Sequence, residues 1–342
     1  MNNGVFLLMP ECLICYIYSV VYPDYLYMQN LRGNDWMVIV NPNAGKGRGE
    51  KDWERISGLL VLHHISFEHI FTCCQKHAIT LARDGILNGY RNIVVVGGDG
   101  TLNEVVNGVF TQEACPSTDI TLALVKVGTG NDWGKMFGIP LNYEEAVRII
   151  RTKRTRLQDV GAVEYMLGSV REKRYFLNIA GLGFDAMVVK RTNLQKEKGK
   201  SGKALYLMNL LNCLLQYSYT TTEIDIDGLR IRHPVFTMSI GIGKYSGGGM
   251  MQTPAAVPDD GLFDITLIKK ISKIDIILSL KKLYDGSILS HPKIEGFRGK
   301  IIEITSNPLI HLETDGESLG HSPVRFHIIP RSIQIACNQN LE

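Results

Sequence analysis

The sequence predicts an α/β domain followed by an all-β domain of the sandwich type. In the first half, short apolar strands alternate with helical stretches, and this alternation indicates a parallel sheet with helices on both faces. From about Asp159 onward, short alternating strands dominate, which is typical of an antiparallel sandwich or barrel. A length of 342 residues also suggests two domains.

The first domain is expected over residues 36–158. Its strands are predicted at 37–40, 66–72, 92–96 and 120–125, and its helices at 51–63, 77–87 and 102–109. A last strand at 332–337 returns to this domain in our reading, so that residues 330–340 complete it.

The second domain is expected over residues 159–329. Its strands are predicted at 174–179, 222–226, 235–241, 263–268, 301–306 and 324–329, with helices near 203–216 and 274–284. Residues 1–35 form an extension of unknown role. Its apolar run is interrupted by Pro10 and Glu11 and is too short for a membrane span.

Bulk composition excludes some functions. A net charge of +3 is too small to indicate nucleic acid as a partner. The seven cysteines are scattered without metal-ligand spacing, and we expect a reduced, cytoplasmic compartment.

Three glycine-rich turns follow predicted parallel strands, at 41–45, 97–104 and 128–133. The carboxyl ends of such strands line one crevice. Glycine lets backbone N–H groups approach phosphate oxygens, and the following helix N-terminus favours negative charge. We therefore expect the three turns to converge on one polyphosphate.

The second turn, Gly-Gly-Asp-Gly-Thr, carries the strongest signal. It is neither a Walker A loop nor a dinucleotide fingerprint, because both spacings are absent. A carboxylate between glycines is rarely buried without a partner. The functional interpretation puts Asp99 near Mg²⁺ or a terminal phosphate; a plain turn is the alternative.

The other two turns are less specific. A simple turn before a helix explains 41–45 equally well. In the third turn Asn131 and Asp132 are expected to cap a helix and also to face the crevice. The Thr129 hydroxyl is expected to meet a phosphate oxygen.

Two acidic turns lie in the second domain. Asp259-Asp260-Gly261 favours a β-turn, but such a turn also suits a hard cation held by a carboxylate, carbonyls and waters. Asp315-Gly316 favours a hairpin turn.

Together and in this order, these motifs resemble the diacylglycerol kinase catalytic-domain family. The closer resemblance is to its soluble bacterial lipid-kinase branch, which is related to sphingosine kinases. It extends from Trp36 to about Cys337 and rests on the combination of 97–104, 128–132 and 315–317. It implies an α/β nucleotide-binding domain of the NAD-kinase/diacylglycerol-kinase type, a C-terminal β-sandwich domain, and ATP in the cleft between them.

The resemblance also implies roles for individual residues. Glu317 matches the proposed general base, and Asp99 would help to place the catalytic Mg²⁺. The positions that match ATP contacts are Asn41, Pro42, Asn43, Ala44, Gly45, Thr72, Gly97, Gly98, Asp99, Gly100, Thr101, Leu102, Asn103 and Thr129.

A structural metal is implied as well. Asp260 would bind it through its carboxylate, and Val257 and Leu262 through backbone carbonyls. Asp132 and Asp159 match, with Asp99, a carboxylate network linked to that metal through water. One departure is Lys126, where relatives usually carry Pro; it either adds charge near the phosphates or points to solvent.

The resulting expectation is an ATP- and Mg²⁺-dependent lipid kinase acting on a diacylglycerol or sphingoid-type hydroxyl. We expect a cytoplasmic protein with a lipid substrate, peripheral contact with the inner membrane face and no nucleic-acid partner; a homodimer is compatible with the sequence. A basic cluster precedes an apolar helix and suggests membrane docking, although a solvated loop before a core helix explains it too. The cluster comprises Lys190, Arg191, Lys196, Lys198, Lys200 and Lys203.

Two rival functions stay open. An NAD kinase shares the Gly-Gly-Asp-Gly loop and the two-domain plan, but lacks a loop of the 128–132 type. A non-catalytic lipid- or nucleotide-binding module would retain the fold alone. Nothing in the sequence selects the acceptor lipid.

Overall fold

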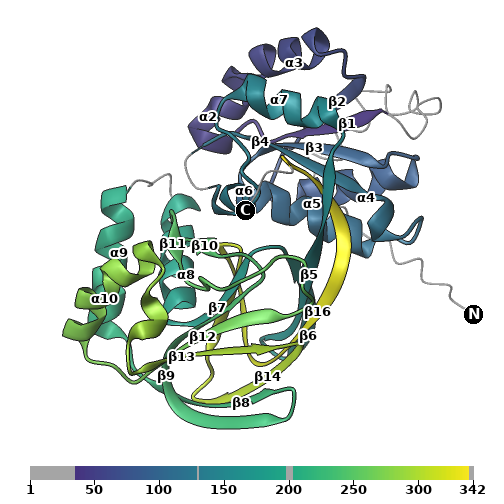
Figure 1. Ribbon diagram of the computed structural model, residues 1–342. Coiled ribbons are helices and arrows are strands. Elements are labelled where there is room, and N and C mark those ends of the chain that lie inside the picture. Colours follow the sequence, from purple (N-terminus) through teal and green to yellow (C-terminus); the bar gives the residue numbers. More distant parts are fainter. Residues whose placement is uncertain (1–34, 129–130, 198–202, 339–342) are drawn as a thin grey trace, which may run out of the picture.

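The chain folds into two lobes joined by a pair of long strands (Figure 1). The computed structural model describes residues 35–128, 131–197 and 203–338. The predicted extension lies outside the described residues except for its last position, Asp35. Among the described residues, no helix is both long enough and apolar enough to cross a membrane.

The first lobe is built on a parallel sheet in the order β2–β1–β3–β4. Its strands are β1 (Trp36–Val40), β2 (Phe67–Phe71), β3 (Asn92–Gly97) and β4 (Thr121–Lys126). Val94 and Val96 pack on one face of the sheet, and Ile93 and Val95 on the other. Both faces are therefore buried, as a parallel sheet requires, and the α/β prediction is confirmed.

Helices cover both faces of this sheet (Figure 1). Residues of α4 and α5 belong to the apolar cluster on one face, and residues of α3 and α7 to the cluster on the other. The predicted helix 51–63 is mainly α3, preceded by a separate α2. Helix α6 begins where Asn131 and Asp132 were expected to cap a helix, while α7 was not predicted. The helices are α2 (Ala44–Lys51), α3 (Trp53–Leu62), α4 (His77–Leu87), α5 (Asp99–Thr111), the 3₁₀ helix η3 (Ser117–Asp119), α6 (Asp132–Met136) and α7 (Tyr143–Thr152).

The second lobe is mainly antiparallel, as predicted. Its apolar core contains Phe176, Phe263 and Phe326, and the rings of Phe176 and Phe263 stack with centroids 5.9 Å apart. Its strands are β5 (Thr155–Leu167), β6 (Val170–Phe176), β7 (Ile179–Gly183), β8 (Thr220–Ile226), β9 (Leu229–Gly241), β10 (Tyr245–Ser246), β11 (Met250–Met251), β12 (Phe263–Lys269), β13 (Ile294–Gly299), β14 (Ile301–Asn307), β15 (His311–Thr314) and β16 (Glu317–Ala336).

Helices gather at one side of this lobe (Figure 1). They are α8 (Phe184–Glu197), α9 (Lys203–Gln216), α10 (Lys273–Asp285) and the 3₁₀ helix η4 (Ile288–Ser290). The predictions at 203–216 and 274–284 are confirmed, whereas α8 was missed. The predicted strand 174–179 is two strands, because the backbone N–H groups of Leu177 and Asn178 donate to the Asp315 carboxylate.

One long antiparallel ribbon joins the lobes. Strand β16 pairs with β5 from His321 opposite Met166 to Ala336 opposite Thr155. Near its end it also pairs in parallel with β4, with Ile335 opposite Leu122. The predicted boundary between residues 158 and 159 falls inside β5. A single strand thus begins at Glu317 in the second lobe and ends in the first lobe's sheet.

Candidate active site

A polar pocket of about 220 Å³ lies at the carboxyl ends of β1 and β2 and the start of α5. Four of the predicted nucleotide contacts line it: Asn41, Asn43, Thr72 and Thr101. The sequence analysis missed three more lining residues, Cys74, Gln75 and Glu104. Residues from two loops and from helix α5 therefore meet in one cavity.

Asn41 ties the first loop to the second. Its Nδ2 donates to Thr101 Oγ1 at 2.8 Å, and its Oδ1 accepts from the backbone N–H of Asn43 at 3.0 Å. The Asn41 side chain therefore holds both its own loop and the start of α5, the two parts of the pocket wall that contain Asn43 and Thr101.

Glu104 positions the segment 72–75, which forms the remaining wall of the pocket. Its carboxylate accepts from the backbone N–H groups of Lys76 at 2.8 Å and Ala78 at 3.2 Å, at the start of α4. Burial raises the pKa of the Glu104 carboxyl. This residue therefore anchors the segment after Thr72 to α5.

Glycines allow the loops to touch. Gly45 has a φ of 60°, and a Cβ on it would lie 3.0 Å from the Cα of Gly128. A Cβ on Gly98 would lie 3.1 Å from Asn131 Oδ1. The three predicted turns thus converge; Thr129 lies outside the described residues.

Two predicted contacts turn their side chains elsewhere. Leu102 is 2% exposed and belongs to the apolar core. Asn103 is 1% exposed; its Nδ2 donates to Asp315 Oδ2 at 2.9 Å, and its Oδ1 accepts from Arg174 Nη2 at 2.8 Å. Neither side chain lines the pocket, and Asn103 instead connects the two lobes.

Asp99 opens helix α5. Its Oδ2 accepts from the backbone N–H of Asp132 at 2.9 Å, whereas its buried Oδ1 has no hydrogen-bond partner among the described residues. Burial raises the pKa of the Asp99 carboxyl to about 7, and the charges of Asp132 and Asp315 add to the rise. An unpartnered buried carboxylate oxygen fits a hard cation such as Mg²⁺.

Asp132 connects the first lobe to a glycine loop of the second. Its Oδ1 accepts from Lys135 Nζ at 2.9 Å, and its Oδ2 accepts from the backbone N–H of Gly248 at 2.6 Å. Gly247, Gly248 and Gly249 all have positive φ values, of 61°, 88° and 102°, a backbone conformation that glycine tolerates best.

Lys126 is buried, with 7% of its surface exposed. Burial lowers the pKa of its ammonium group, while the carboxylates of Asp99 and Asp132 act to raise it. Of the two alternatives for this departure from the family pattern, the solvent-facing one is wrong. Lys126 instead lies close enough to Asp99 and Asp132 to feel the charges of both carboxylates.

Glu317 follows a tight hairpin turn. Asp315 and Gly316 have φ values of 50° and 84°, and Thr314 pairs with Glu317 across the turn. Asp-Gly with two positive φ values matches a type I′ turn. A Cβ on Gly100, in the first turn of α5, would lie 3.2 Å from Glu317 Oε1, so the predicted base lies against the second glycine loop.

The Asp315 carboxylate holds this turn in place. Its Oδ1 accepts from the backbone N–H groups of Asn178 and Ile179, both at 3.1 Å. Its Oδ2 accepts from Asn103 Nδ2 at 2.9 Å and Leu177 N at 3.0 Å. Four donors surround one carboxylate, although burial still raises the pKa of this group. The sequence pattern predicted only a hairpin turn at Asp315.

Two more acids lie beside the turn and were not predicted. Glu313 is 4% exposed, and its Oε2 accepts from the Gly316 N–H at 2.8 Å. A Cβ on Gly181 would lie 2.6 Å from Glu313 Oε1, so glycine leaves the space for this carboxyl. Burial raises the pKa of Glu313 well above its usual value and that of Asp185 to about 6.

The predicted metal loop lies beside Asp159, in the first half of β5. Asp159 accepts from the backbone N–H groups of Gly261 at 2.7 Å and Arg331 at 2.6 Å. The Asp260 carboxylate is already engaged on both oxygens, by Leu262 N at 3.1 Å and by Arg298 Nη2. Within the described ranges, no three acidic, histidine or cysteine side chains converge as metal ligands. The structural metal stays a prediction, in competition with a guanidinium.

Comparison with known protein families matches both lobes. The diacylglycerol kinase catalytic domain matches residues 35–163, and the YegS C-terminal NAD kinase beta sandwich-like domain matches residues 178–337.

Individual relatives cover most of the chain. YtlR of Bacillus subtilis is 29% identical over 313 residues, covering 88% of this chain and 98% of the relative. The diacylglycerol kinase of Staphylococcus carnosus is 26% identical over 300 residues, covering 87% of this chain and 93% of the relative.

Solved structures share the fold. A diacylglycerol kinase from Bacillus anthracis superposes with a TM-score of 0.67 at 22% identity, covering 92% of this chain and 100% of that one. Yeast NADH kinase reaches a TM-score of 0.50 at 13% identity, covering 90% of this chain and 84% of that one.

Proposed function

Because the chain belongs to the diacylglycerol kinase catalytic-domain family and is a kinase that transfers phosphate to an alcohol, we propose that it phosphorylates a lipid hydroxyl with Mg²⁺-ATP. Diacylglycerol and sphingoid bases are the acceptor classes. The observation that carries this proposal is the position of Glu317 against Gly100, which directly precedes Thr101, a residue that lines the polar pocket together with Asn41.

The first turn of α5 supports phosphate binding. Its orphan N–H groups and the positive end of the helix favour negative charge. The Asn41–Thr101 hydrogen bond and the Gly45–Gly128 contact preorganise the loops around it. Fixed donors of this kind stabilise charge that spreads over the transferred phosphoryl group.

Asp99 is the residue proposed to hold the metal that accompanies ATP. Its Oδ1 is buried and unpartnered within the described part of the chain, and its Oδ2 is fixed by Asp132 N. Mg²⁺ held by Asp99 would neutralise negative charge on the phosphate groups of ATP. The ionised form of Asp99 is the one that binds a cation.

Glu317 is proposed as the general base. The hairpin turn, the four hydrogen bonds to Asp315 and the ribbon of β5 and β16 orient it toward α5. A carboxylate there accepts the proton of the attacking lipid hydroxyl. Burial raises the pKa of the neighbouring Glu313 carboxyl.

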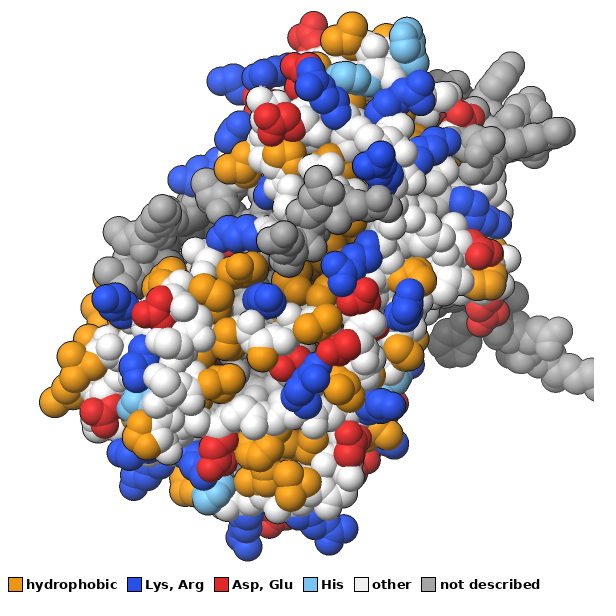
Figure 2. Space-filling view, viewed as in Figure 1, with side chains coloured by type: hydrophobic (Ala, Val, Ile, Leu, Met, Phe, Trp, Pro, Cys, Tyr) orange, Lys and Arg blue, Asp and Glu red, His pale blue; other side chains and the backbone are white. Residues whose placement is uncertain are grey.

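The helical end of the second lobe is proposed to contact a membrane. Lys273 Nζ donates to the carbonyl of Leu215 at 2.8 Å, which joins α10 to α9. Leu215 and Ile274 are each 70% exposed, and Leu278 is 72% exposed. Orange and blue side chains lie at this end of the molecule together with some red ones (Figure 2), and the apolar and basic groups among them suit an anionic bilayer surface.

Vesicle sedimentation tests the membrane contact. Leu278→Asp should reduce binding to phosphatidylglycerol vesicles several-fold, because it places a carboxylate on the apolar face. Leu62, 67% exposed at the end of α3, supplies the matched control, and Leu62→Asp should bind as the unaltered protein does. Equal vesicle binding by Leu278→Asp and Leu62→Asp would contradict a role of this surface in membrane contact.

Radiolabelled phosphate transfer from ATP tests the proposed function. Diacylglycerol, monoacylglycerol, phosphatidylglycerol and sphingoid bases are offered in mixed micelles with Mg²⁺, and NAD serves as a soluble acceptor. Transfer to one lipid class, reduced about 10²-fold or more in Glu317→Gln with ATP affinity retained, is expected. Transfer to NAD alone would favour an NAD kinase, and no transfer at all a binding module.

A further inference from the structure

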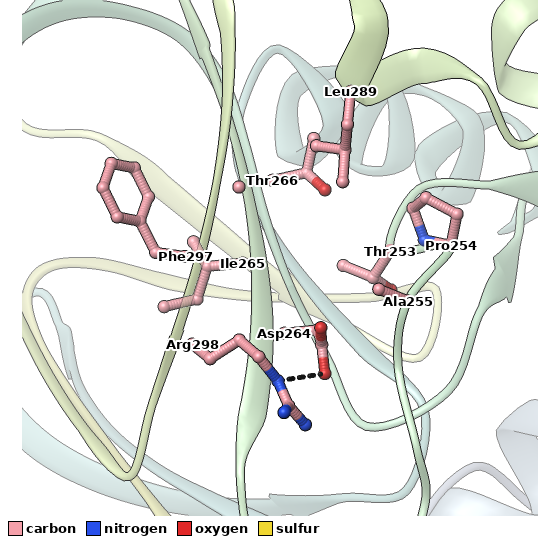
Figure 3. A pocket seen from close by; sticks show the side chains of 10 residues that line it. Thr253, Pro254, Ala255, Asp264, Ile265, Thr266, Leu289, Phe297 and Arg298 are labelled. Atoms are coloured by element: carbon pink, nitrogen blue, oxygen red, sulfur yellow. Dashed lines mark hydrogen bonds and ion pairs between the residues drawn. The ribbon is translucent and has the colours of Figure 1, made fainter.

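Arg298 lies where the family pattern implies a metal. It stands directly opposite Asp264 in the β12–β13 ladder, and its Nε donates to Asp264 Oδ2 at 3.3 Å. Its Nη2 donates to Asp260 Oδ2. Figure 3 shows Arg298 reaching to Asp264 at the edge of a pocket of about 280 Å³. Strand pairing therefore fixes one guanidinium between two carboxylates.

Both carboxylate oxygens of Asp260 accept hydrogen bonds from within the protein. Its Oδ1 accepts from the backbone N–H of Leu262 at 3.1 Å, while Arg298 engages its Oδ2. Asp260 is the only side chain in the implied donor set, since Val257 and Leu262 would contribute carbonyls. A metal ion would have to displace a guanidinium, which is always charged and has a fork of donors suited to carboxylates.

Asp264 needs a cation nearby. Its side chain is 7% exposed, and a buried carboxylate is costly unless it is paired. The Arg298 side chain is 46% exposed, so its outer part stays hydrated while it neutralises the buried acid. Both acids are thereby compensated within the protein.

Other contacts join the 257–262 loop to residues of β5. Arg156 binds Asp259 in bidentate fashion, with Nε–Oδ2 at 3.0 Å and Nη2–Oδ1 at 2.8 Å. The Asp159 carboxylate accepts from Gly261 N, and its own N–H donates to the carbonyl of Pro258 at 2.7 Å. None of these contacts requires an ion.

We propose that Arg298 is the resident cation of the 257–262 loop and takes the place of a structural divalent metal. Its guanidinium joins Asp260 to Asp264 and so fixes the loop to the β12–β13 edge. The loop folds and stays closed without bound metal.

Metal content and thermal unfolding test this with the full chain and no nucleotide or lipid. The purified protein should contain well under one equivalent of divalent metal, and its Tm in EDTA should lie within about 1 °C of its Tm in MgCl₂ or CaCl₂. One retained ion per chain, or a clear fall in Tm with EDTA, would overturn the proposal. Since no ATP is present, the result does not depend on the kinase assignment.

A pair of arginine variants tests the role of the side chain. Arg298→Gln should lower Tm by about 3 °C or more, because it leaves Asp264 buried and unpaired. Arg325 pairs with Glu303 between exposed side chains on neighbouring strands, so Arg325→Gln should change Tm by about 1 °C or less.

Equal Tm values for these two variants would rule the proposal out. Arg298→Lys keeps the charge but loses the fork, and we expect an intermediate Tm. If Arg298→Gln does not fold, the Arg298→Lys variant tests the proposal instead. A Tm of Arg298→Lys equal to that of the unaltered protein would show that the guanidinium bridge between Asp260 and Asp264 is not needed.

Discussion

The carboxylate of Glu317 lies against the backbone of Gly100, so closely that a Cβ on Gly100 would be 3.2 Å from Glu317 Oε1. Glu317 opens the strand that runs back into the first lobe, and Gly100 lies in the first turn of the helix behind the glycine loop. The two lobes therefore meet where the proposed phosphate-binding element faces the proposed base.

Gly100→Ala should lower kcat about tenfold at saturating ATP, because the added methyl group shifts the Glu317 carboxylate by a few tenths of an ångström or more. Stability should not fall, since alanine is favoured over glycine in a helix. Gly58→Ala in α3 is the control, because nothing lies within 4 Å of its Cβ position. An unchanged kcat in Gly100→Ala would contradict a catalytic role for this contact.

Asp315→Asn should destabilise the protein. Each carboxylate oxygen accepts two N–H groups, so the new NH₂ group faces two donors in either orientation and leaves them unsatisfied. A loss of about 2 kcal/mol follows, which lowers Tm by several degrees. Activity should fall as well, since the same turn carries Glu317.

Thermal unfolding followed by circular dichroism measures the effect of Asp315→Asn. Asp285→Asn, at an exposed helix end, supplies a control with the same chemical change. If the two variants had the same Tm, the four hydrogen bonds would carry no net stability.

Asp132→Ala should loosen the glycine loop of the second lobe. The variant removes the acceptor of the 2.6 Å hydrogen bond from Gly248 N and leaves Lys135 without its ion pair. Limited proteolysis should then cut within 247–249 several-fold faster. Asp132→Asn keeps an oxygen acceptor and should be cut at an intermediate rate, and no change in rate for either variant would disprove the link.

Asp99→Asn should stabilise the nucleotide-free protein at pH 8 while removing most of its activity. The pKa of this carboxyl is raised from 3.8 to about 7 by burial, so between these pH values the folded state binds more protons than the unfolded state. The contribution of Asp99 to stability therefore falls as the pH rises through this window. Asparagine removes that pH-dependent loss.

The measurement for Asp99→Asn is Tm as a function of pH, without Mg²⁺ or ATP. The variant should gain a few degrees over the unaltered protein at pH 8, and the gain should shrink toward pH 4. A constant difference across this range would mean that the pKa of Asp99 is not raised.

Local pattern was enough to predict the pocket. Glycine-rich turns directly follow apolar strands in this sequence, and the carboxyl ends of parallel strands must meet along one edge of a sheet. That rule brought Asn41 and Thr101 together in advance, and the structure places both on one pocket. Thr72, which only the family resemblance indicated, lines the same pocket. Helix α4 was predicted with its observed bounds, because its apolar positions recur with helical period.

Long-range pairing decided the rest. Asn103 and Asp315 are 212 positions apart, and no local pattern indicates that an amide inside a helix will bond a carboxylate in a distant turn. The same holds for Gly181, which leaves space for Glu313, and for Arg298, which strand register sets opposite Asp264.

The sequence by itself determined which residues bear charge and which turns suit phosphate, since backbone sterics and periodicity act locally. Tertiary structure alone decided which acids are buried and what each one faces. Lys126 illustrates the division: its charge is evident in the sequence, but only the packing of β4 against α6 buries it beside Asp99 and Asp132. Burial and partner choice depend on contacts between distant segments, and those are settled only when the whole chain packs.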